Sequence, residues 1–254
     1  MLSAERITKE LNNLGITPPK IVFYEVTDST NTRAKEFAKE NPKNRDTVVF
    51  IANGQSAGRG RRGRSFVSNS GAGIYLSILA YPDEKVRDAT VATAKAAVLL
   101  SRAIEQLCDC KIGIKWVNDL YLGGKKLAGI LTEGETREDG KMAYQVIGMG
   151  INVYKNSISE EISHIATSLE SEVVAPPDRA KLVATIIKEF VSFGGNFYDE
   201  YRARSFIIGK TVTVLKPTES YDAKVIDINP DFSLTVDRKG IKERIFTGEI
   251  SIKV

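Results

Sequence analysis

A loop of three glycines and four arginines, Gly58-Arg-Gly-Arg-Arg-Gly-Arg64, lies between two apolar segments and limits the folds open to this chain. Its letters satisfy the G-x-G-x-x-G pattern of dinucleotide-binding folds, in which a helix must follow the last glycine directly. The segments before and after the loop, residues 47–53 and 74–79, are short and bounded by turn residues, as is typical of strands. A strand after the loop argues against the dinucleotide-binding fold.

The composition of this arginine loop indicates an anion-binding site. Glycine lets the backbone turn sharply and approach a ligand closely, and guanidinium groups donate to phosphate and carboxylate oxygens. The alternative is a solvated basic loop without a ligand, because charge runs are common on protein surfaces. Solubility does not require glycine between the arginines. The net charge is only +4, so the basic character matters where it is concentrated.

The remaining composition excludes several kinds of chemistry. His164 is the single histidine, so Ser-His-Asp, Cys-His and multi-histidine metal sites are set aside. Cys108 and Cys110 are too close for an ordinary disulfide and too few for a structural zinc site, which predicts reduced thiols. There is neither an apolar run of about 20 residues nor the apolar core of a secretory signal at the start of the chain. We therefore predict a cytoplasmic protein that does not enter a membrane.

The periodicity of apolar residues predicts an α+β fold with two domains, residues 1–205 and 206–254. In the first, helices are expected over 2–14, from the Thr27–Asn31 junction to Asn41-Pro42, over 84–107 and over 178–204, and strands over 20–26, 47–53, 74–79, 111–117, 125–133 and 142–152. In the second, short β-rich runs over 211–215, 221–228, 232–236 and 243–254 predict a small barrel.

Three places within these elements carry polar or flexible residues with two interpretations each. Asp28 and Ser29 precede a helix, and on local evidence they are N-cap residues rather than ligand-binding ones. Alternation places Lys126 on one face with Ala128 and Ile130, which favours a functional lysine, whereas Asp119 is either functional or a turn residue. The glycines at 148 and 150 indicate close approach of a ligand or another backbone.

Five motifs together resemble the biotin protein ligases over essentially the whole chain. The motifs are Asp28-Ser-Thr-Asn31, Gly58–Arg64, Lys115-Trp-Val-Asn-Asp119, Lys126-Leu-Ala-Gly-Ile-Leu131 and Gly148-Met-Gly-Ile-Asn152. The resemblance implies a mixed-sheet catalytic domain flanked by helices, a C-terminal SH3-like barrel, and a two-step ligase. In the first step biotin and MgATP give biotinyl-5′-adenylate, and in the second a lysine of a biotin carboxyl-carrier domain is biotinylated.

The same resemblance implies roles for individual residues. Fixed positive charge from Arg59, Arg61 and Lys126 would relieve the repulsion between carboxylate and phosphate, and Asp119 would orient or deprotonate the acceptor amine. The biotin-binding candidates are Ser29, Thr30, Asn31, Gln55, Gly58, Arg59, Gly60, Arg61 and Lys126. The candidates for ATP or the adenylate are Arg61, Arg62, Arg64, Phe66, Asn118, Lys126 and Asn152. No metal ligands are assigned.

Two departures and two alternatives accompany the resemblance. Many members have proline at the position of Val117 and tryptophan at that of Phe66. Phe66 can still stack on adenine, but its ring has less area and a weaker π-face than that of tryptophan, so the departure bears on nucleotide affinity and not on the mechanism. The chain begins at the helix before the catalytic domain, so we expect a monofunctional enzyme that does not bind DNA, and homodimerisation stays open. The alternatives are a lipoate or other acyl ligase on a related scaffold, and a nucleic-acid-binding module that uses the arginine loop.

Overall fold

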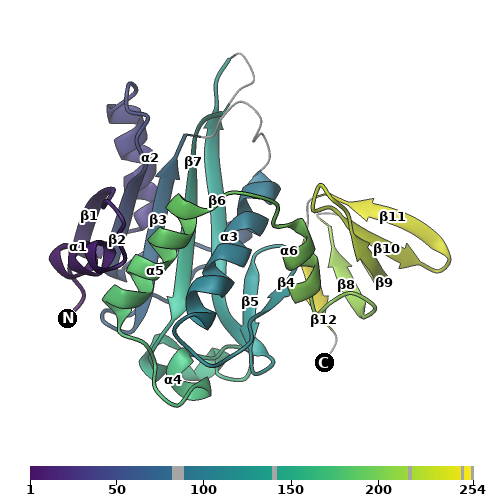
Figure 1. Ribbon diagram of the computed structural model, residues 1–254. Helices are drawn as coiled ribbons and strands as arrows, with labels where there is room; N and C mark the ends of the chain where they lie inside the picture. The colour runs from purple at the N-terminus through teal and green to yellow at the C-terminus, as the bar shows by residue number, and fades with distance from the viewer. Residues whose placement is uncertain (82–88, 139–141, 217–218, 247–248, 253–254) are drawn as a thin grey trace.

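The computed structural model describes residues 1–81, 89–138, 142–216, 219–246 and 249–252. A large mixed β-sheet with helices on both faces forms most of the molecule, and a smaller antiparallel sheet lies beside it (Figure 1). The expected α+β class is therefore confirmed. Among the described residues, none of the helices combines the length and the apolar character needed to cross a membrane.

The large sheet has seven strands in the order β1-β2-β3-β7-β6-β5-β4. Their bounds are β1 (Lys20–Thr27), β2 (Val48–Gln55), β3 (Gly73–Ala80), β4 (Gly113–Lys115), β5 (Asp119–Leu122), β6 (Lys125–Thr136) and β7 (Met142–Asn152). Strands β1 and β2 are parallel, and helix α2 (Thr30–Glu40) makes the crossover that a parallel pair requires. The other neighbouring strands are antiparallel. The arginine loop connects β2 to β3, as the absence of a helix after it predicted.

Helices cover the two faces of this sheet unequally. Alternate residues of β2 face opposite sides: Val49 and Ile51 join the main apolar core, whereas Val48 and Phe50 pack with Ala34 of α2. The long helices of the main core are α1 (Ala4–Asn13), α3 (Ala89–Glu105) and α5 (Arg179–Ser192), and the short helices α4 (Leu169–Glu172) and α6 (Tyr198–Arg204) add one buried residue each. The expected start of α3 at residues 84–88 lies outside the described residues.

The helix expected over residues 178–204 is wrong, because the structure has two helices there. Helix α5 ends at Ser192, and α6 (Tyr198–Arg204) begins after a break. Gly195 in this break has a φ of 127°, a backbone conformation that residues other than glycine rarely adopt. Two adjacent glycines, Gly194 and Gly195, were the sequence signal for the break.

The small sheet has the order β11-β10-β9-β8-β12, with antiparallel neighbours. Its strands are β8 (Thr211–Leu215), β9 (Ser220–Ile228), β10 (Leu234–Arg238), β11 (Ile241–Ile245) and β12 (Glu249–Ile252). Closure of this sheet into a barrel and a domain boundary at residue 206 stay predictions; residues 247–248 and 253–254 of the last expected run lie outside the described residues. Trp116 connects the two sheets by donating from Nε1 to the carbonyl of Phe232 at 2.8 Å.

Candidate functional site

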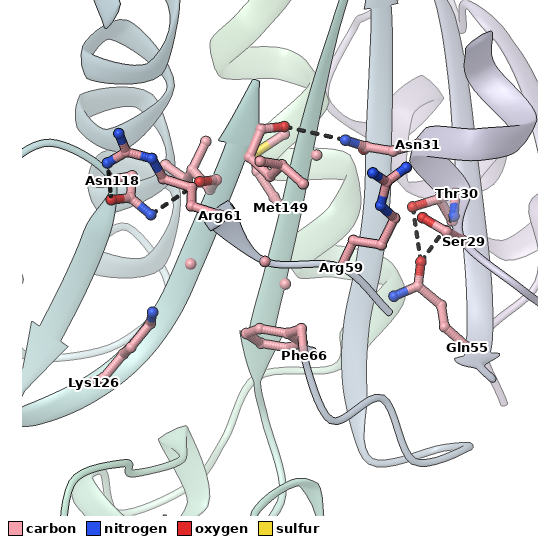
Figure 2. Close-up of a pocket in the computed structure, with 16 residues that line it drawn as sticks. Ser29, Thr30, Asn31, Gln55, Arg59, Arg61, Phe66, Asn118, Lys126 and Met149 are labelled. Carbon is pink, nitrogen blue, oxygen red and sulfur yellow. Dashed lines mark hydrogen bonds between the residues drawn. The ribbon is translucent and has the colours of Figure 1, made fainter. Parts of the chain in front are cut away.

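Two adjoining cavities open around the arginine loop, with volumes of about 490 and 600 Å³. Figure 2 shows the first of them. The first is lined by Ser29, Thr30, Asn31, Gln55, Arg59, Gly60, Arg61, Phe66, Asn118, Lys126, Gly129, Ile130, Leu131, Gly148, Met149 and Gly150. The second is lined by Gly60, Arg61, Arg62, Arg64, Ser65, Phe66, Lys115, Trp116, Asn118, Asp119, Lys126 and Ile250. Because the two share five residues, they form one cleft with two compartments.

The arginine loop is a small hairpin rather than an irregular coil. Phe66 N donates to Gly58 O at 2.9 Å and Gly60 N donates to Arg64 O at 2.7 Å. A Cβ atom on Gly58 would lie 2.4 Å from the carbonyl oxygen of Phe66, so glycine is required there by the backbone of the loop itself. Gly58 was a biotin-binding candidate, but it does not line either cavity. At the tip, Arg62 has a φ of 55°.

One end of the first cavity is formed by the N-terminus of α2 and the end of β2. Gln55 Oε1 accepts from Thr30 N at 2.8 Å and from Thr30 Oγ1 at 3.2 Å, and Gln55 Nε2 donates to Ser68 Oγ. Gln55, the last residue of β2, therefore caps the N-terminus of α2. Ser29 is the N-cap residue of α2, as predicted, but its side chain makes no capping hydrogen bond. Its side chain lines the first cavity instead (Figure 2).

Asn31 is also at this end and is buried, with its amide fully engaged. Asn31 Nδ2 donates to Leu131 O at 3.3 Å and to Glu133 Oε2 at 2.8 Å, and Asn31 Oδ1 accepts from Ser77 Oγ at 2.6 Å. A Cβ atom on Gly148 would lie 2.1 Å from Asn31 Oδ1. The predicted close approach at Gly148 is thus made by a side chain.

Glu133, within β6, is a charged group beside the cavity that was not among the predicted site residues. Burial raises its pKa, but hydrogen bonds from Lys35 and Asn31, and the charges of Lys35 and Arg59, outweigh burial and hold the pKa below its ordinary value. Lys35 Nζ lies 2.8 Å and Arg59 Nη1 3.7 Å from Glu133 Oε1. A carboxylate at the end of an apolar strand was the sequence signal that could have identified it.

Lys126 and Asp119 lie at the junction of the two compartments. Lys126 Nζ is 2.7 Å from Asp119 Oδ1. Asp119 is the first residue of β5, so the interpretation as a turn residue is wrong.

The predicted face of Lys126 is also wrong. Tyr121 pairs with Lys126 and Leu120 with Ala128, so a β-bulge at this point breaks the alternation. Lys126 instead lies over Gly129, where an added Cβ would be 3.4 Å from Nζ, while Ala128 and Ile130 are buried in the core.

The second compartment gathers cationic and aromatic side chains. Arg61 Nη1 donates to Asn118 Oδ1 at 3.1 Å, and Arg62 Nη1 donates to Leu215 O of the small sheet at 3.3 Å. Arg64 lines this compartment as well. Three arginines, Lys115 and Lys126 against the one carboxylate of Asp119 make it a site for anions.

Phe66 lines both compartments and packs against glycine. A Cβ atom on Gly150 would lie 2.6 Å from the Phe66 ring, so the glycine makes room for this aromatic side chain. Asn152, a candidate for contact with adenine, lines neither cavity: its Nδ2 donates to Thr167 O at 3.1 Å. Within the described ranges, no cluster of three or more histidine, cysteine or acidic residues could hold a metal ion.

The comparisons with known proteins agree with the resemblance. Residues 23–152 match the biotin/lipoate A/B protein ligase family. The chain is similar to the bifunctional ligase/repressor BirA of Bacillus subtilis, with 36% identity over 169 residues, which is 66% of this chain and 51% of that protein. It is also similar to the biotin–[acetyl-CoA-carboxylase] ligase of Mycobacterium tuberculosis, with 35% identity over 187 residues, 68% of this chain and 66% of that protein. The chain thus spans about half the length of the first relative.

A solved structure shares the fold. Biotin protein ligase from Aquifex aeolicus, in complex with biotin and ATP, aligns with a TM-score of 0.76 at 24% identity, over 92% of this chain and 98% of that one.

Proposed function

Since the chain belongs to the biotin/lipoate A/B protein ligase family, we propose that it activates biotin with MgATP and transfers it to a lysine of a biotin carboxyl-carrier domain. The names of the relatives support biotin as the substrate. The observation that carries the proposal is Lys126, which lines both compartments. It joins the first, whose far end presents neutral hydrogen-bonding side chains, to the cationic second one.

The two compartments match the two ends of the intermediate. Biotin has a neutral ureido ring that needs hydrogen-bond donors and acceptors, and the side chains of Ser29, Thr30 and Gln55 offer both. Its carboxylate lies at the far end of the molecule. ATP brings phosphates that match the guanidinium groups of Arg61, Arg62 and Arg64. The carboxylate and the α-phosphate would then meet beside Lys126.

In the first step, a carboxylate oxygen attacks the α-phosphorus, the bond to the β-phosphate oxygen breaks, and pyrophosphate leaves. Lys126, with Arg59 and Arg61, stabilises the negative charge that accumulates where the two anions meet. Magnesium would enter with the nucleotide, with the oxygens of Asn118 and Asp119 available in the same compartment, and would add positive charge at the phosphates.

In the second step, a lysine amine of the carrier attacks the carbonyl carbon of the adenylate. An amide bond forms, the bond to the phosphate oxygen breaks, and AMP leaves. The amine must lose a proton to act as a nucleophile, and we propose that the Asp119 carboxylate, which lines the second compartment, orients the amine or accepts that proton. We also propose that the small sheet is the SH3-like barrel of this family.

The competing substrate is lipoate, whose dithiolane ring has no N–H or carbonyl group. Such a ring offers no hydrogen bond to the oxygens of Thr30 and Gln55 that line the cavity and would displace water from them, which costs binding free energy. Titration of the protein with biotin and with lipoate separates the two. We expect micromolar or tighter binding of biotin and none of lipoate, followed by biotinylation of a carrier domain with ATP, detected by mass spectrometry. Preference for lipoate would refute the proposal.

A further inference from the structure

A chain of polar side chains runs from Glu133, outside the first cavity, to Thr30 on its wall. Glu133 contacts Asn31, Asn31 contacts Ser77, and Ser77 contacts Thr30. Asn31, Ser77 and Thr30 are each less than 5% exposed. Because buried polar groups must satisfy one another, the positions of the protons along this chain can be deduced by counting them.

The count begins at Asn31, whose amide has one possible orientation. Its Nδ2 atom faces two oxygens, the carbonyl of Leu131 and the carboxylate of Glu133, and neither can donate. The amide therefore directs both N–H groups at them, and Oδ1 must face Ser77. Since Asn31 Oδ1 can only accept, the single hydroxyl proton of Ser77 lies in the 2.6 Å contact between them.

The next contact fixes the proton of Thr30. Ser77 Oγ and Thr30 Oγ1 are 2.7 Å apart and need a proton between them, but that of Ser77 is already used. The Thr30 hydroxyl therefore donates to Ser77. The longer contact, 3.2 Å from Thr30 Oγ1 to Gln55 Oε1, is then left without a hydroxyl proton. Gln55 Oε1 still accepts from the backbone N–H of Thr30.

The result is a cavity wall with a defined polarity. Thr30 Oγ1 and Gln55 Oε1 present two acceptor oxygens side by side on residues that line the first cavity (Figure 2). A ligand N–H placed against them is bound, whereas a ligand oxygen at the same place meets two further oxygens and is rejected.

From this count we propose that Glu133 is a positioning residue that acts through Asn31 and Ser77 to keep Thr30 as a hydrogen-bond acceptor. The cavity thereby selects ligands that present a ring N–H at this point. The inference rests on the proposed function, because it takes the ureido ring of biotin as the group bound there. Glu133 does not contact the substrate. It sets the hydrogen-bond direction of Thr30 through the two side chains between them, Asn31 and Ser77.

The Glu133→Gln variant tests this polarity with little change in shape. Lys35 and Arg59 both contact Glu133 Oε1, so the oxygen of the introduced side chain turns to them and its amide nitrogen faces Asn31. Asn31 must then turn its oxygen to the introduced amide nitrogen and its N–H groups to Ser77. This reverses the chain and directs the Thr30 proton toward Gln55.

The measurement is the dissociation constant for biotin and for two carbamate analogues, each with oxygen in place of one ureido N–H. In the unmodified protein we expect one of the analogues to bind about tenfold weaker than biotin or worse. In Glu133→Gln this ratio should fall to about threefold or less, mainly through weaker binding of biotin. An unchanged ratio, or an equal loss for biotin and analogue, would overturn the inference.

Three further variants make the result specific. Ser77→Ala interrupts the chain at its centre, so the ratio should also fall, which preserves the test if Glu133→Gln does not fold. Glu135→Gln, which loses a carboxylate bound to Tyr144 outside this chain, should keep the ratio of the unmodified protein. Lys35→Met removes the charge beside Glu133 but leaves it an acceptor, so the ratio should also persist, and its collapse would contradict the proton count. Failure of the proposed function is distinct, because the unmodified protein would then not bind biotin.

Discussion

Lys126 Nζ lies 2.7 Å from Asp119 Oδ1, so the cation and the carboxylate at the junction of the two compartments form an ion pair. They lie on the neighbouring strands β5 and β6, where Asp119 pairs with Gly129 and Lys126 extends over that glycine. A carboxylate or phosphate that binds Lys126 competes with Asp119 for the same ammonium group. We infer that binding of the anionic substrates releases Asp119 for the second step.

Replacing Lys126 by alanine should suppress formation of the adenylate. Loss of one preorganised charge at the reacting anions should lower the rate about 100- to 1,000-fold. The rate of pyrophosphate release with biotin and ATP measures this. Lys125→Ala is the matched control, because Lys125 Nζ donates to Ser163 O away from both cavities, and it should keep the normal rate. Pyrophosphate release by Lys126→Ala at the normal rate would refute the role.

Asp119→Ala should affect the second step more than the first. Without the carboxylate, the carrier amine has no group beside it to orient or deprotonate it, so transfer should slow about 100-fold. Pyrophosphate release and single-turnover transfer to a carrier domain should be measured on the same preparation. An equal loss of both steps would mean that Asp119 serves the metal or the structure of the hairpin.

Alanine substitutions at Gly148 and Gly150 should affect the binding of biotin and of ATP differently. In Gly148→Ala the new methyl group displaces Asn31, so biotin binding should weaken, whereas in Gly150→Ala it displaces Phe66, so ATP binding should weaken more than that of biotin. Overpacking of this kind corresponds to roughly tenfold in a dissociation constant. Titration of each variant with each ligand gives the four values. The same loss of both ligands in both variants would contradict these assignments.

An ion-pair cluster should make stability depend on pH. Burial raises the pKa of Glu105 and of Glu200, but the hydrogen bonds of Glu105 with Arg204 and those of Glu200 with Arg102 and Arg204 outweigh burial and lower both values. A lowered folded-state pKa contributes stability that is present above the unfolded value, 4.5 for both groups, and is lost as pH falls below it. The free energy of unfolding should therefore decrease as the pH falls from about 5 through the lowered folded-state pKa values.

Arg204→Met tests the same cluster directly. It leaves two partly buried carboxylates without their shared cation and should cost about 2–3 kcal/mol near neutral pH, measured by urea unfolding. The loss should shrink at low pH. The control is Arg202→Met, on the same helix as Arg204. It removes an exposed ion pair with Asp227 of β9 and should change stability little. Equal effects of the two variants at all pH values would contradict this prediction.

Much of the fold follows from local signals. The short apolar runs over residues 47–53 and 74–79 and the lack of a helix after the arginine loop predicted β2, β3 and their connection. The helix expected over residues 2–14 is α1, and Ser3 caps it by accepting from Arg6 N. Where the prediction failed, a local signal was outweighed or overlooked: two glycines divide the helix over 178–204, and the bulge of β6 moves Lys126 to another face.

The site was predicted less completely, because its second layer depends on distant partners. Thr30, Arg61 and Lys126 lie in the quoted motifs, whereas Gln55 and Phe66 were named only through the family resemblance; all five line the first cavity. Glu133 and Ser77 had no motif: their contacts with Asn31 span 102 and 46 residues of sequence. Only the order of strands in the sheet brings such residues together.

Exchange of labelled pyrophosphate into ATP is the most direct test of the central claim, that this chain activates biotin as an adenylate. The reverse of the first step returns label to ATP only when biotin, ATP and enzyme form the mixed anhydride. We predict exchange that requires biotin, is not supported by lipoate, and is lost in Lys126→Ala but kept in Lys125→Ala. Exchange that is independent of biotin, or its absence with biotin and MgATP present, would contradict the account.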